Sequence, residues 1–324
     1  MWFSNGDSIG RLATDGVLHT FTGPDIDDAY AGIAVGSDGA LWFTNSRNNS
    51  IGRVTTSGVV TNYSDTTIDQ PWGIAAGPDG ALWFTNASNN SIGRITTSGV
   101  VTNYTNPGID TPFGITEGPD AAMWFTNANG DSIGRITTSG AITIYTDSSI
   151  GGPTSIVTGS DGALWFTNND YNTIGRITTS GVVTSYSDPI INYPESITAG
   201  PDGALWFTGS WIGRITTSGV ESVYKGPTLL ISGGDHPGSA VTVTGAGFQP
   251  SETVRVVYKT GLTSPSLASV PICSATVTNS GSYSCPGRIP TEPAAGPHED
   301  HTIIAKGETS LIEVKSTYYV GPSS

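Results

Sequence analysis

The feature that most constrains the fold of this chain is a tryptophan that returns at an almost constant interval. It stands in a Trp-Phe pair, and successive copies are 40 residues apart once and 41 residues apart four times. A period near forty residues is typical of a propeller or a solenoid, in which one supersecondary unit is repeated. The positions are Trp2, Trp42, Trp83, Trp124, Trp165 and Trp206.

Each repeat carries four short β-like runs and no helical periodicity. In the second repeat the runs are Gly32–Val35, Ala40–Asn45, Ser50–Thr55 and Val59–Tyr63, with frequent β-branched and aromatic residues. Gly-Xaa-Asp-Gly turns separate the first two runs, and Thr-Thr-Ser-Gly turns separate the last two. Four antiparallel strands in about forty residues make one propeller blade, and the missing 3.6-residue period excludes a helical solenoid.

The sequence therefore predicts an all-β protein whose first domain, residues 1–224, is a β-propeller with six visible blades. The first blade, residues 1–23, is incomplete, because Met1-Trp2-Phe3 aligns with Met123-Trp124-Phe125 inside a second strand. We expect the chain to be an N-terminally truncated piece of a longer protein, with a signal peptide upstream. Five full blades follow at about 30–63, 71–104, 112–145, 153–186 and 194–224.

Two residues that recur in every blade are interpreted as structural. The repeated Trp is expected to pack between neighbouring blades, because it buries a large area; a row of ligand-stacking tryptophans is the alternative. The Arg of the Ile-Gly-Arg motif is expected to pair with an Asp or a backbone carbonyl between blades. Six such arginines spread around a ring do not form a basic patch.

Charge and composition exclude several classes of partner. The formal charge is −14, from 13 Lys and Arg against 27 Asp and Glu, which argues against nucleic acid and anionic membranes. No run of eighteen apolar residues exists, so no membrane span is expected. The low charge and abundant Thr, Ser, Asn and Gly suit a secreted bacterial β-protein. We expect a monomer that is extracellular or on the cell surface.

The repeat stops after Tyr224, and residues 228–324 form a second predicted domain. They contain no Trp, and strand-like runs separated by turns predict a β-sandwich. Cys273 and Cys285, which flank a predicted hairpin over Ala275–Ser284, are expected to form a disulfide, as suits an oxidising compartment. His298-Glu299-Asp300-His301 is interpreted as a solvated loop, with a metal motif as the alternative. The strand-like runs are 228–232, 240–245, 253–259, 274–279, 302–306 and 316–320.

The propeller repeat resembles a known enzyme family. The unit Pro-Xaa-Gly-Ile, Gly-Pro-Asp-Gly-Ala-Leu-Trp-Phe-Thr, Ile-Gly-Arg-Ile-Thr-Thr-Ser-Gly, clearest at Pro71–Gly99 and Pro112–Gly140, resembles the streptogramin B lyase (virginiamycin B lyase) family. The resemblance covers residues 1–224. It implies a seven-bladed propeller that opens a cyclic depsipeptide antibiotic by elimination at an ester bond, with a magnesium ion. The tail, with Val241–Gly245, looks like a bacterial immunoglobulin-like module of cell-surface proteins.

The same resemblance places catalytic histidines just after the Pro that opens the first strand of a blade, with acidic residues nearby. None of the residues at that position is His: they are Ala31, Trp72, Phe113, Thr154 and Glu195. The residue after Trp-Phe-Thr, commonly Glu in the family, is Asn or Gly here. We therefore expect the lyase fold without the family's acid–base residues. Whether the chain is a carbon–oxygen lyase stays open, and Glu195 is the one catalytic candidate.

The loops before the first strand and after the second strand of each blade share one face of such a propeller. Aromatic rings beside amide side chains suit neutral, hydroxyl-rich ligands such as sugars. The alternative is that the repeated Asn residues cap strand ends. Symmetry breaks at Trp72, Phe113, Glu117, Tyr171, Glu195 and Trp211. The candidate ligand-binding residues are Trp72, Phe113, Asn45, Asn86, Asn127, Asn168 and Glu195.

Three functions follow from these patterns. The first is a non-catalytic propeller that binds a neutral glycan, a peptide or a cell-envelope component, and it needs no cofactor and no metal. The second is a lyase that opens cyclic depsipeptides, for which the resemblance implies magnesium. The third is a structural segment of an adhesin, which predicts no ligand at all.

Overall fold

The computed structural model describes the whole chain except residues 14, 30–31, 190, 211, 225–227, 249–250, 261–268, 279–280, 292–299, 311 and 322–324. The described residues form thirty strands and no α-helix, which confirms the all-β class. No helix long and apolar enough to cross a bilayer occurs among them. The chain divides into two compact units, Met1–Val223 and Tyr224–Ser324.

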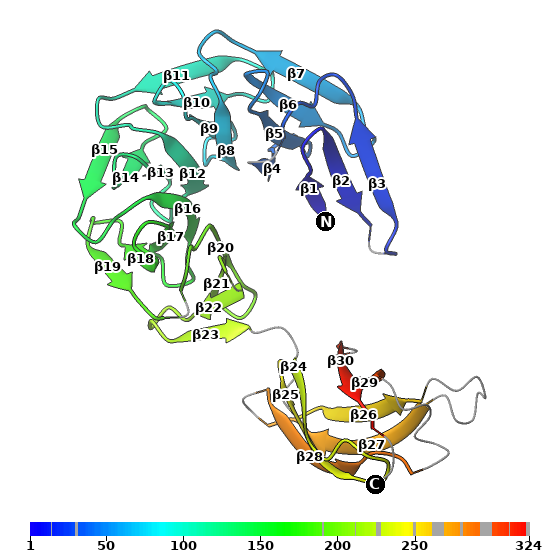
Figure 1. The fold of residues 1–324 in the computed structure, drawn as a ribbon. Helices are drawn as coiled ribbons and strands as arrows, with labels where there is room; N and C mark the ends of the chain where they lie inside the picture. Colours follow the sequence, from blue (N-terminus) through cyan, green and yellow to red (C-terminus); the bar gives the residue numbers. More distant parts are fainter. Residues whose placement is uncertain are drawn as a thin grey trace. The chain divides into compact units, whose positions relative to one another are not determined.

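The first unit is a series of six antiparallel sheets that follow one another in chain order, each sheet a propeller blade (Figure 1). The first blade has three strands, β1 (Trp2–Ser4), β2 (Ser8–Leu12) and β3 (Leu18–Thr22). The innermost strands of the next five blades, β4, β8, β12, β16 and β20, lie beside one another around the centre. This arrangement confirms the predicted propeller with an incomplete first blade.

The other five blades have four strands each, paired in chain order. The second blade comprises β4 (Ile33–Val35), β5 (Leu41–Asn45), β6 (Ser50–Val54) and β7 (Val60–Ser64). The third comprises β8 (Pro71–Ala76), β9 (Leu82–Asn86), β10 (Ser91–Ile95) and β11 (Val101–Thr105). The fourth comprises β12 (Pro112–Glu117), β13 (Met123–Asn127), β14 (Ser132–Ile136) and β15 (Ile142–Thr146). The last two comprise β16 (Pro153–Thr158), β17 (Leu164–Asn168), β18 (Thr173–Ile177) and β19 (Val183–Tyr186), then β20 (Ser196–Ala199), β21 (Leu205–Thr208), β22 (Ile212–Ile215) and β23 (Glu221–Tyr224).

The repeated Trp packs between blades, as predicted. Trp83 is fully buried and belongs to one cluster with Ile115, Met123 and Phe125, which come from the next blade. Its ring also stacks on Tyr104 of its own blade, with 5.4 Å between the ring centroids. Burial of so large a side chain between blades contributes to their cohesion.

The repeated Arg pairs with an Asp, but the predicted place of the pair between blades is wrong. Arg94 Nε donates to Asp79 Oδ2 at 2.6 Å, and Asp79 belongs to the turn between β8 and β9 of the same blade. The other oxygen of Asp79 accepts a hydrogen bond from Trp83 Nε1 at 3.1 Å. Five blades repeat this arrangement, so the Arg, Asp and Trp fix the hairpin of one blade.

The motif Ile-Gly-Arg needs glycine for a steric reason. A Cβ atom on Gly93 would lie 2.1 Å from the Cζ atom of Phe84, because the Phe ring of the neighbouring strand lies across the glycine. The same contact recurs in the other blades. The contact between the Phe of the second strand and the Gly of the third strand therefore explains why both residues recur in every blade.

The second unit is a sandwich of two sheets. One sheet has the order β24 (Thr228–Gly233), β25 (Ala240–Ala246) and β28 (Tyr283–Arg288). The other has the order β27 (Ser269–Thr276), β26 (Thr253–Lys259), β29 (Asp300–Gly307) and β30 (Glu313–Tyr319). Residues from both sheets, among them Val243, Val256 and Ile303, form one buried core.

Cys273 and Cys285 are joined by a disulfide, as predicted. The predicted hairpin between them is wrong, however: β27 pairs with β26, whereas β28 pairs with β25 in the opposite sheet. The chain still turns where expected, since Gly281 N donates to Thr278 O at 2.9 Å. The disulfide consequently links the two sheets of the sandwich rather than two neighbouring strands.

Candidate ligand pocket

A cavity of about 570 Å³ opens where the first strands of four successive blades begin. It brings together three of the predicted ligand-binding residues, Trp72, Phe113 and Glu195. These residues occupy equivalent positions in blades three, four and six, and Thr154 is their equivalent in blade five. The full lining is Trp72, Gly73, Phe113, Gly114, Thr154, Ser155, Asn169, Glu195 and Ser196.

A bulge at the start of the first strand exposes these side chains. In the third blade Pro71 pairs with Asn86, but the register shifts before Ile74, so Trp72 and Gly73 do not pair with the second strand. The same shift occurs after Pro112 and after Pro153. Bulges commonly redirect side chains next to binding sites. Here the residue after the Pro is freed from the strand pairing and reaches the cavity.

A threonine from the motif Trp-Phe-Thr holds each of these positions in place. Thr85 Oγ1 accepts a hydrogen bond from Gly73 N at 2.9 Å and donates one to Phe113 O in the next blade at 2.8 Å. Equivalent threonines bind the carbonyl oxygens of Trp72, Thr154 and Glu195. Sequence reasoning missed this role, although the Thr recurs in five of the six blades, with Ser4 in its place in the first. The residues are Thr44, Thr85, Thr126 and Thr167.

Small residues next to the aromatic positions let the blades approach closely. A Cβ atom on Gly73 would lie 2.4 Å from the carbonyl oxygen of Phe113. In the fifth blade Ser155 replaces this glycine, and its hydroxyl accepts a hydrogen bond from Ile197 N at 3.3 Å. Thr154 Oγ1 donates to Glu195 O at 2.8 Å. The backbone of the pocket is thus fixed by hydrogen bonds that cross each blade junction.

The lining has an aromatic side and a polar side. The rings of Trp72 and Phe113 lie 5.0 Å apart between centroids and are tilted by 44°. Trp72 is 38% exposed, whereas Trp42, Trp83, Trp124 and Trp165 are fully buried. The polar side is formed by Asn169 and by the exposed Glu195. The Nδ2 atom of Asn169 donates a hydrogen bond to Pro194 O at 3.4 Å. Such a cavity can stack an apolar face while hydrogen bonding to hydroxyl groups.

The four predicted asparagines do not line this cavity. Asn45, Asn86, Asn127 and Asn168 are all fully buried. Asn86 is representative: its Oδ1 accepts from Asp69 N at 3.1 Å, and its Nδ2 donates to Ser91 Oγ at 3.1 Å and Thr67 O at 3.3 Å. Their amides therefore tie the segment between blades to the end of the second strand, which is the alternative that the sequence left open.

The remaining candidates lie elsewhere. Glu117 and Tyr171 are exposed and do not line the pocket, whereas Ala31, Trp211 and His298 fall outside the described residues. His301 is buried, with Nδ1 3.1 Å from Lys259 O. In the described part of the chain no three His, Cys, Asp or Glu side chains form a metal site. Glu195 is the single carboxylate among the residues that line the pocket.

Comparisons place the chain among known propellers. The model of the virginiamycin B lyase family matches residues 1–145 and, overlapping these, residues 64–229. Virginiamycin B lyase from Staphylococcus aureus is 33% identical, with 90% of this chain and 94% of that chain covered and a TM-score of 0.59. A streptogramin B lyase structure is 31% identical, with 89% and 93% covered and a TM-score of 0.58. No curated protein sequence matches the chain.

A third similar structure is that of a complex. It is a catalytically inactive histidine-to-alanine variant of virginiamycin B lyase from Staphylococcus aureus with quinupristin. It is 29% identical to this chain, with 99% of this chain and 98% of that chain covered and a TM-score of 0.59.

Proposed function

The chain belongs to the virginiamycin B lyase family, and from this premise we propose that it uses the family's propeller to bind a ligand without cleaving it. The ligand is a neutral, hydroxyl-rich molecule, a glycan of the cell envelope in the first place. It binds in the pocket formed by Trp72, Phe113 and Glu195. The observation that carries this proposal is the tilted Trp72–Phe113 pair, held half-exposed beside hydroxyl and amide groups.

Several features support binding of a sugar or a similar ligand. The exposed face of Trp72 offers an apolar platform for the C–H face of a sugar ring. Around it, Thr154, Ser155 and Asn169 provide donors and acceptors that are close enough to orient hydroxyl groups. The threonine hydrogen bonds fix the backbone of the pocket before any ligand arrives, which lowers the entropic cost of binding.

The scarcity of possible bases in the lining, which holds one carboxylate and no histidine, supports binding rather than catalysis. Elimination at an ester needs a group that removes a proton, most often a His or a carboxylate with a suitably raised pKa. None of the residues that line the pocket is a histidine. Glu195 is exposed to solvent and lies beside no other acidic lining residue.

A second candidate is a carbon–oxygen lyase that opens cyclic depsipeptides. Its support is the identity of 33% to a virginiamycin B lyase over most of both chains. Glu195 would be the group that takes the proton, since it is the only carboxylate in the pocket.

A structural segment of an adhesin remains the third candidate, and the open, preformed pocket speaks against it. For all three, the disulfide favours an extracellular or cell-surface location.

The decisive experiment measures binding and turnover on the same samples. Wild type, Trp72→Ala and Tyr171→Ala are titrated with neutral cell-wall oligosaccharides by calorimetry. Tyr171 is a matched control because it is an aromatic side chain, 53% exposed, outside the pocket. We expect Trp72→Ala to weaken binding by about 1–3 kcal/mol, as loss of a central aromatic anchor does. Equal affinity of the two variants would overturn the proposed site.

A ring-opening assay on a streptogramin B depsipeptide, with and without magnesium, separates the second candidate. Elimination does not change the mass, so the reaction is followed by chromatographic retention. Turnover that is abolished in Glu195→Gln would establish the lyase and reject non-catalytic binding. No turnover together with oligosaccharide binding would establish the first proposal, and neither result would leave the structural role.

A further inference from the structure

Positive charge is concentrated in the second unit of this acidic protein. Residues 1–223 carry seven Arg against twenty Asp and Glu, whereas residues 224–324 carry six Lys and Arg against seven Asp and Glu. Four of those six cations lie on one face of one sheet: Arg255, Lys259, Lys306 and Lys315. We call this surface the basic sheet face.

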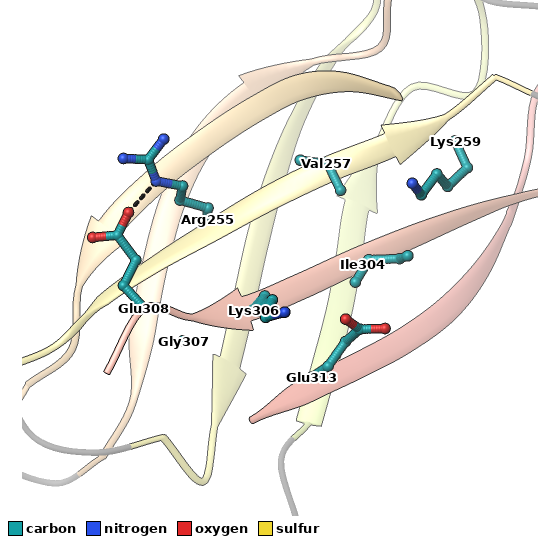
Figure 2. Close-up of a pocket in the computed structure, with 8 residues that line it drawn as sticks. All are labelled: Arg255, Val257, Lys259, Ile304, Lys306, Gly307, Glu308 and Glu313. Carbon is teal, nitrogen blue, oxygen red and sulfur yellow. Dashed lines mark hydrogen bonds and ion pairs between the residues drawn. The ribbon is translucent and has the colours of Figure 1, made fainter. Parts of the chain in front are cut away.

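The alternation of the strands creates this face. In β26, Val254, Val256 and Tyr258 are buried in the sandwich core, so Arg255, Val257 and Lys259 point outward. On β29 the neighbours of these residues are Lys306, opposite Arg255, and Ile304, opposite Val257. Figure 2 shows the side chains of Arg255, Val257 and Lys259 along one strand and those of Ile304 and Lys306 along the next.

The basic sheet face is hollowed by a cavity of about 540 Å³. Its floor is aliphatic and is formed by the cross-strand pair Val257 and Ile304. Cations stand at both ends of that floor, with Arg255 and Lys306 at one end and Lys259 at the other (Figure 2). Because Arg255 and Lys259 are four residues apart in one strand, their Cα atoms are separated by about 13 Å.

The charges of this face are only partly compensated. Arg255 forms an ion pair with Glu308, and both side chains are well exposed. Lys315 Nζ lies 3.3 Å from Glu313, and Lys259 Nζ donates to Ser269 Oγ at 2.6 Å. The side chain of Lys306 is exposed and lies opposite Glu313 of β30, and within the described residues its ammonium group forms no hydrogen bond or ion pair. A ligand carboxylate can therefore pair with Lys306 without first breaking a contact.

The lining residues decide which kind of anion fits. A sugar would favour an aromatic platform, and none of the lining residues is aromatic. A densely charged polymer such as nucleic acid or polyphosphate would be repelled by Glu308 and Glu313, which lie among the cations. A peptide carries fewer charges and can place an aliphatic side chain between them, as the floor requires.

We propose that the basic sheet face binds an extended acidic peptide of a partner protein. In an extended strand, side chains at positions i, i+2 and i+4 point to one side and span about 13 Å. A peptide with carboxylates at i and i+4 and an aliphatic residue at i+2 matches Lys306 with Arg255, the Val257–Ile304 floor, and Lys259. This inference does not depend on the proposed function of the propeller pocket.

The test uses the full chain and two synthetic probes. Fluorescein-labelled Asp-Thr-Val-Thr-Asp and its reversed-charge analogue Lys-Thr-Val-Thr-Lys are titrated by fluorescence polarisation. We expect binding of the acidic peptide only, and at least about ten-fold weaker binding when NaCl rises from low to 0.5 M, because exposed charges are screened. Methyl NMR should show shifts at Val257 and Ile304 and not in the propeller.

Charge reversal variants complete the test. Lys306→Glu should weaken binding of the acidic peptide at least about ten-fold and should favour the basic peptide, since a complementary charge is replaced by a like one. Arg288→Glu is the matched control, because Arg288 lies on β28 of the opposite sheet. The proposal is overturned if both variants bind like wild type, if neither probe binds, or if polyphosphate displaces the peptide more effectively than excess unlabelled peptide. Salt-sensitive self-association abolished by Lys306→Glu, without peptide binding, would also overturn it in favour of a second copy of the chain.

Discussion

The hydroxyl of Thr85 donates a hydrogen bond of 2.8 Å to the carbonyl oxygen of Phe113, which lies in the next blade. The same hydroxyl accepts from the amide of Gly73, so one buried atom joins the second strand of a blade to the first strands of two blades. The order of the pocket therefore depends on residues that do not line it.

Thr85→Val should destabilise the propeller by about 1–3 kcal/mol, because it leaves the buried amide of Gly73 and the carbonyl of Phe113 without their partner. Denaturant unfolding followed by tryptophan fluorescence measures this loss. Thr102→Val is the control, since Thr102 is exposed on β11. Equal stability of the two variants would show that the blade junction does not need the hydroxyl.

Asn86→Ala should lower the free energy of unfolding by about 1–3 kcal/mol, because the buried side chain of Asn86 is lost as the acceptor for the partly buried amide of Asp69. Asn169→Ala should cost much less, since the half-buried side chain of Asn169 makes one long hydrogen bond, of 3.4 Å, within the described residues. Thermal melts of the two variants give the comparison. A larger loss for Asn169→Ala would contradict the structural role assigned to the buried asparagines.

Ala121→Gly should stabilise the protein. Ala121 has a φ of 54° in the turn between β12 and β13, where the equivalent residue of the third blade is Gly80 with a φ of 75°. In this region a residue with a Cβ atom is destabilised by roughly 1–2 kcal/mol relative to glycine. The greater conformational entropy of glycine in the unfolded state offsets part of that difference. A gain of up to about 1 kcal/mol is expected. The reciprocal change Gly80→Ala should destabilise, and the two melting temperatures should move in opposite directions.

Asp79→Asn should show a pH-dependent effect on stability. Burial raises the pKa of Asp79, but hydrogen bonds from Trp83 and Arg94 outweigh it, so the pKa lies below its ordinary value of 3.8. A lowered pKa contributes stability above the unfolded value, and this stability is lost as the pH falls through the folded value. The difference between wild type and Asp79→Asn should be constant near neutral pH and shrink below about pH 4.

The control for this pH series is Asp25→Asn, because the exposed Asp25 carboxylate forms no ion pair among the described residues. Urea unfolding from pH 7 to pH 2.5 supplies the measurement. A difference for Asp79→Asn that persisted undiminished at the lowest pH would mean that the charge of Asp79 does not act.

Replacement of both Cys273 and Cys285 by Ala should destabilise the sandwich and leave the propeller unchanged. A cross-link over a short loop contributes about 2–4 kcal/mol, and this one joins the two sheets. All eight tryptophans belong to the first 211 residues, so tryptophan fluorescence reports on the propeller while circular dichroism also follows the sandwich. An unchanged dichroism transition, or a fluorescence transition shifted by the same amount, would refute the expectation.

The propeller could be predicted from sequence because each blade repeats the same strand, turn and packing residues. In four of the six blades the Trp stands ten residues before the glycine of Ile-Gly-Arg, as Trp83 does before Gly93. A Cβ atom on Gly93 would collide with the ring of Phe84, so this position requires glycine. The residues after the opening Pro, Trp72, Phe113 and Glu195, line one cavity, and that they bind a ligand stays a prediction. Repetition supplied several independent copies of each contact.

Other contacts could not be predicted because they depend on which strands become neighbours. The motif contains Asn86 and Thr85 side by side, yet one caps a loop and the other crosses to the next blade. Sequence cannot tell a buried amide from a pocket amide when both follow a strand. In the sandwich, a turn between Thr278 and Ser282 predicted a hairpin, whereas β27 and β28 belong to opposite sheets. No repeat was present there to reveal the error.

The pocket draws its lining from four consecutive blades, each a separate sheet. A molecule bound there would hence act as a tie across three junctions, adding to the threonine hydrogen bonds that already cross them. Sliding one blade against the next would strain the bound molecule as well as the protein. Binding of a ligand to these few residues would therefore oppose the separation of all four blades.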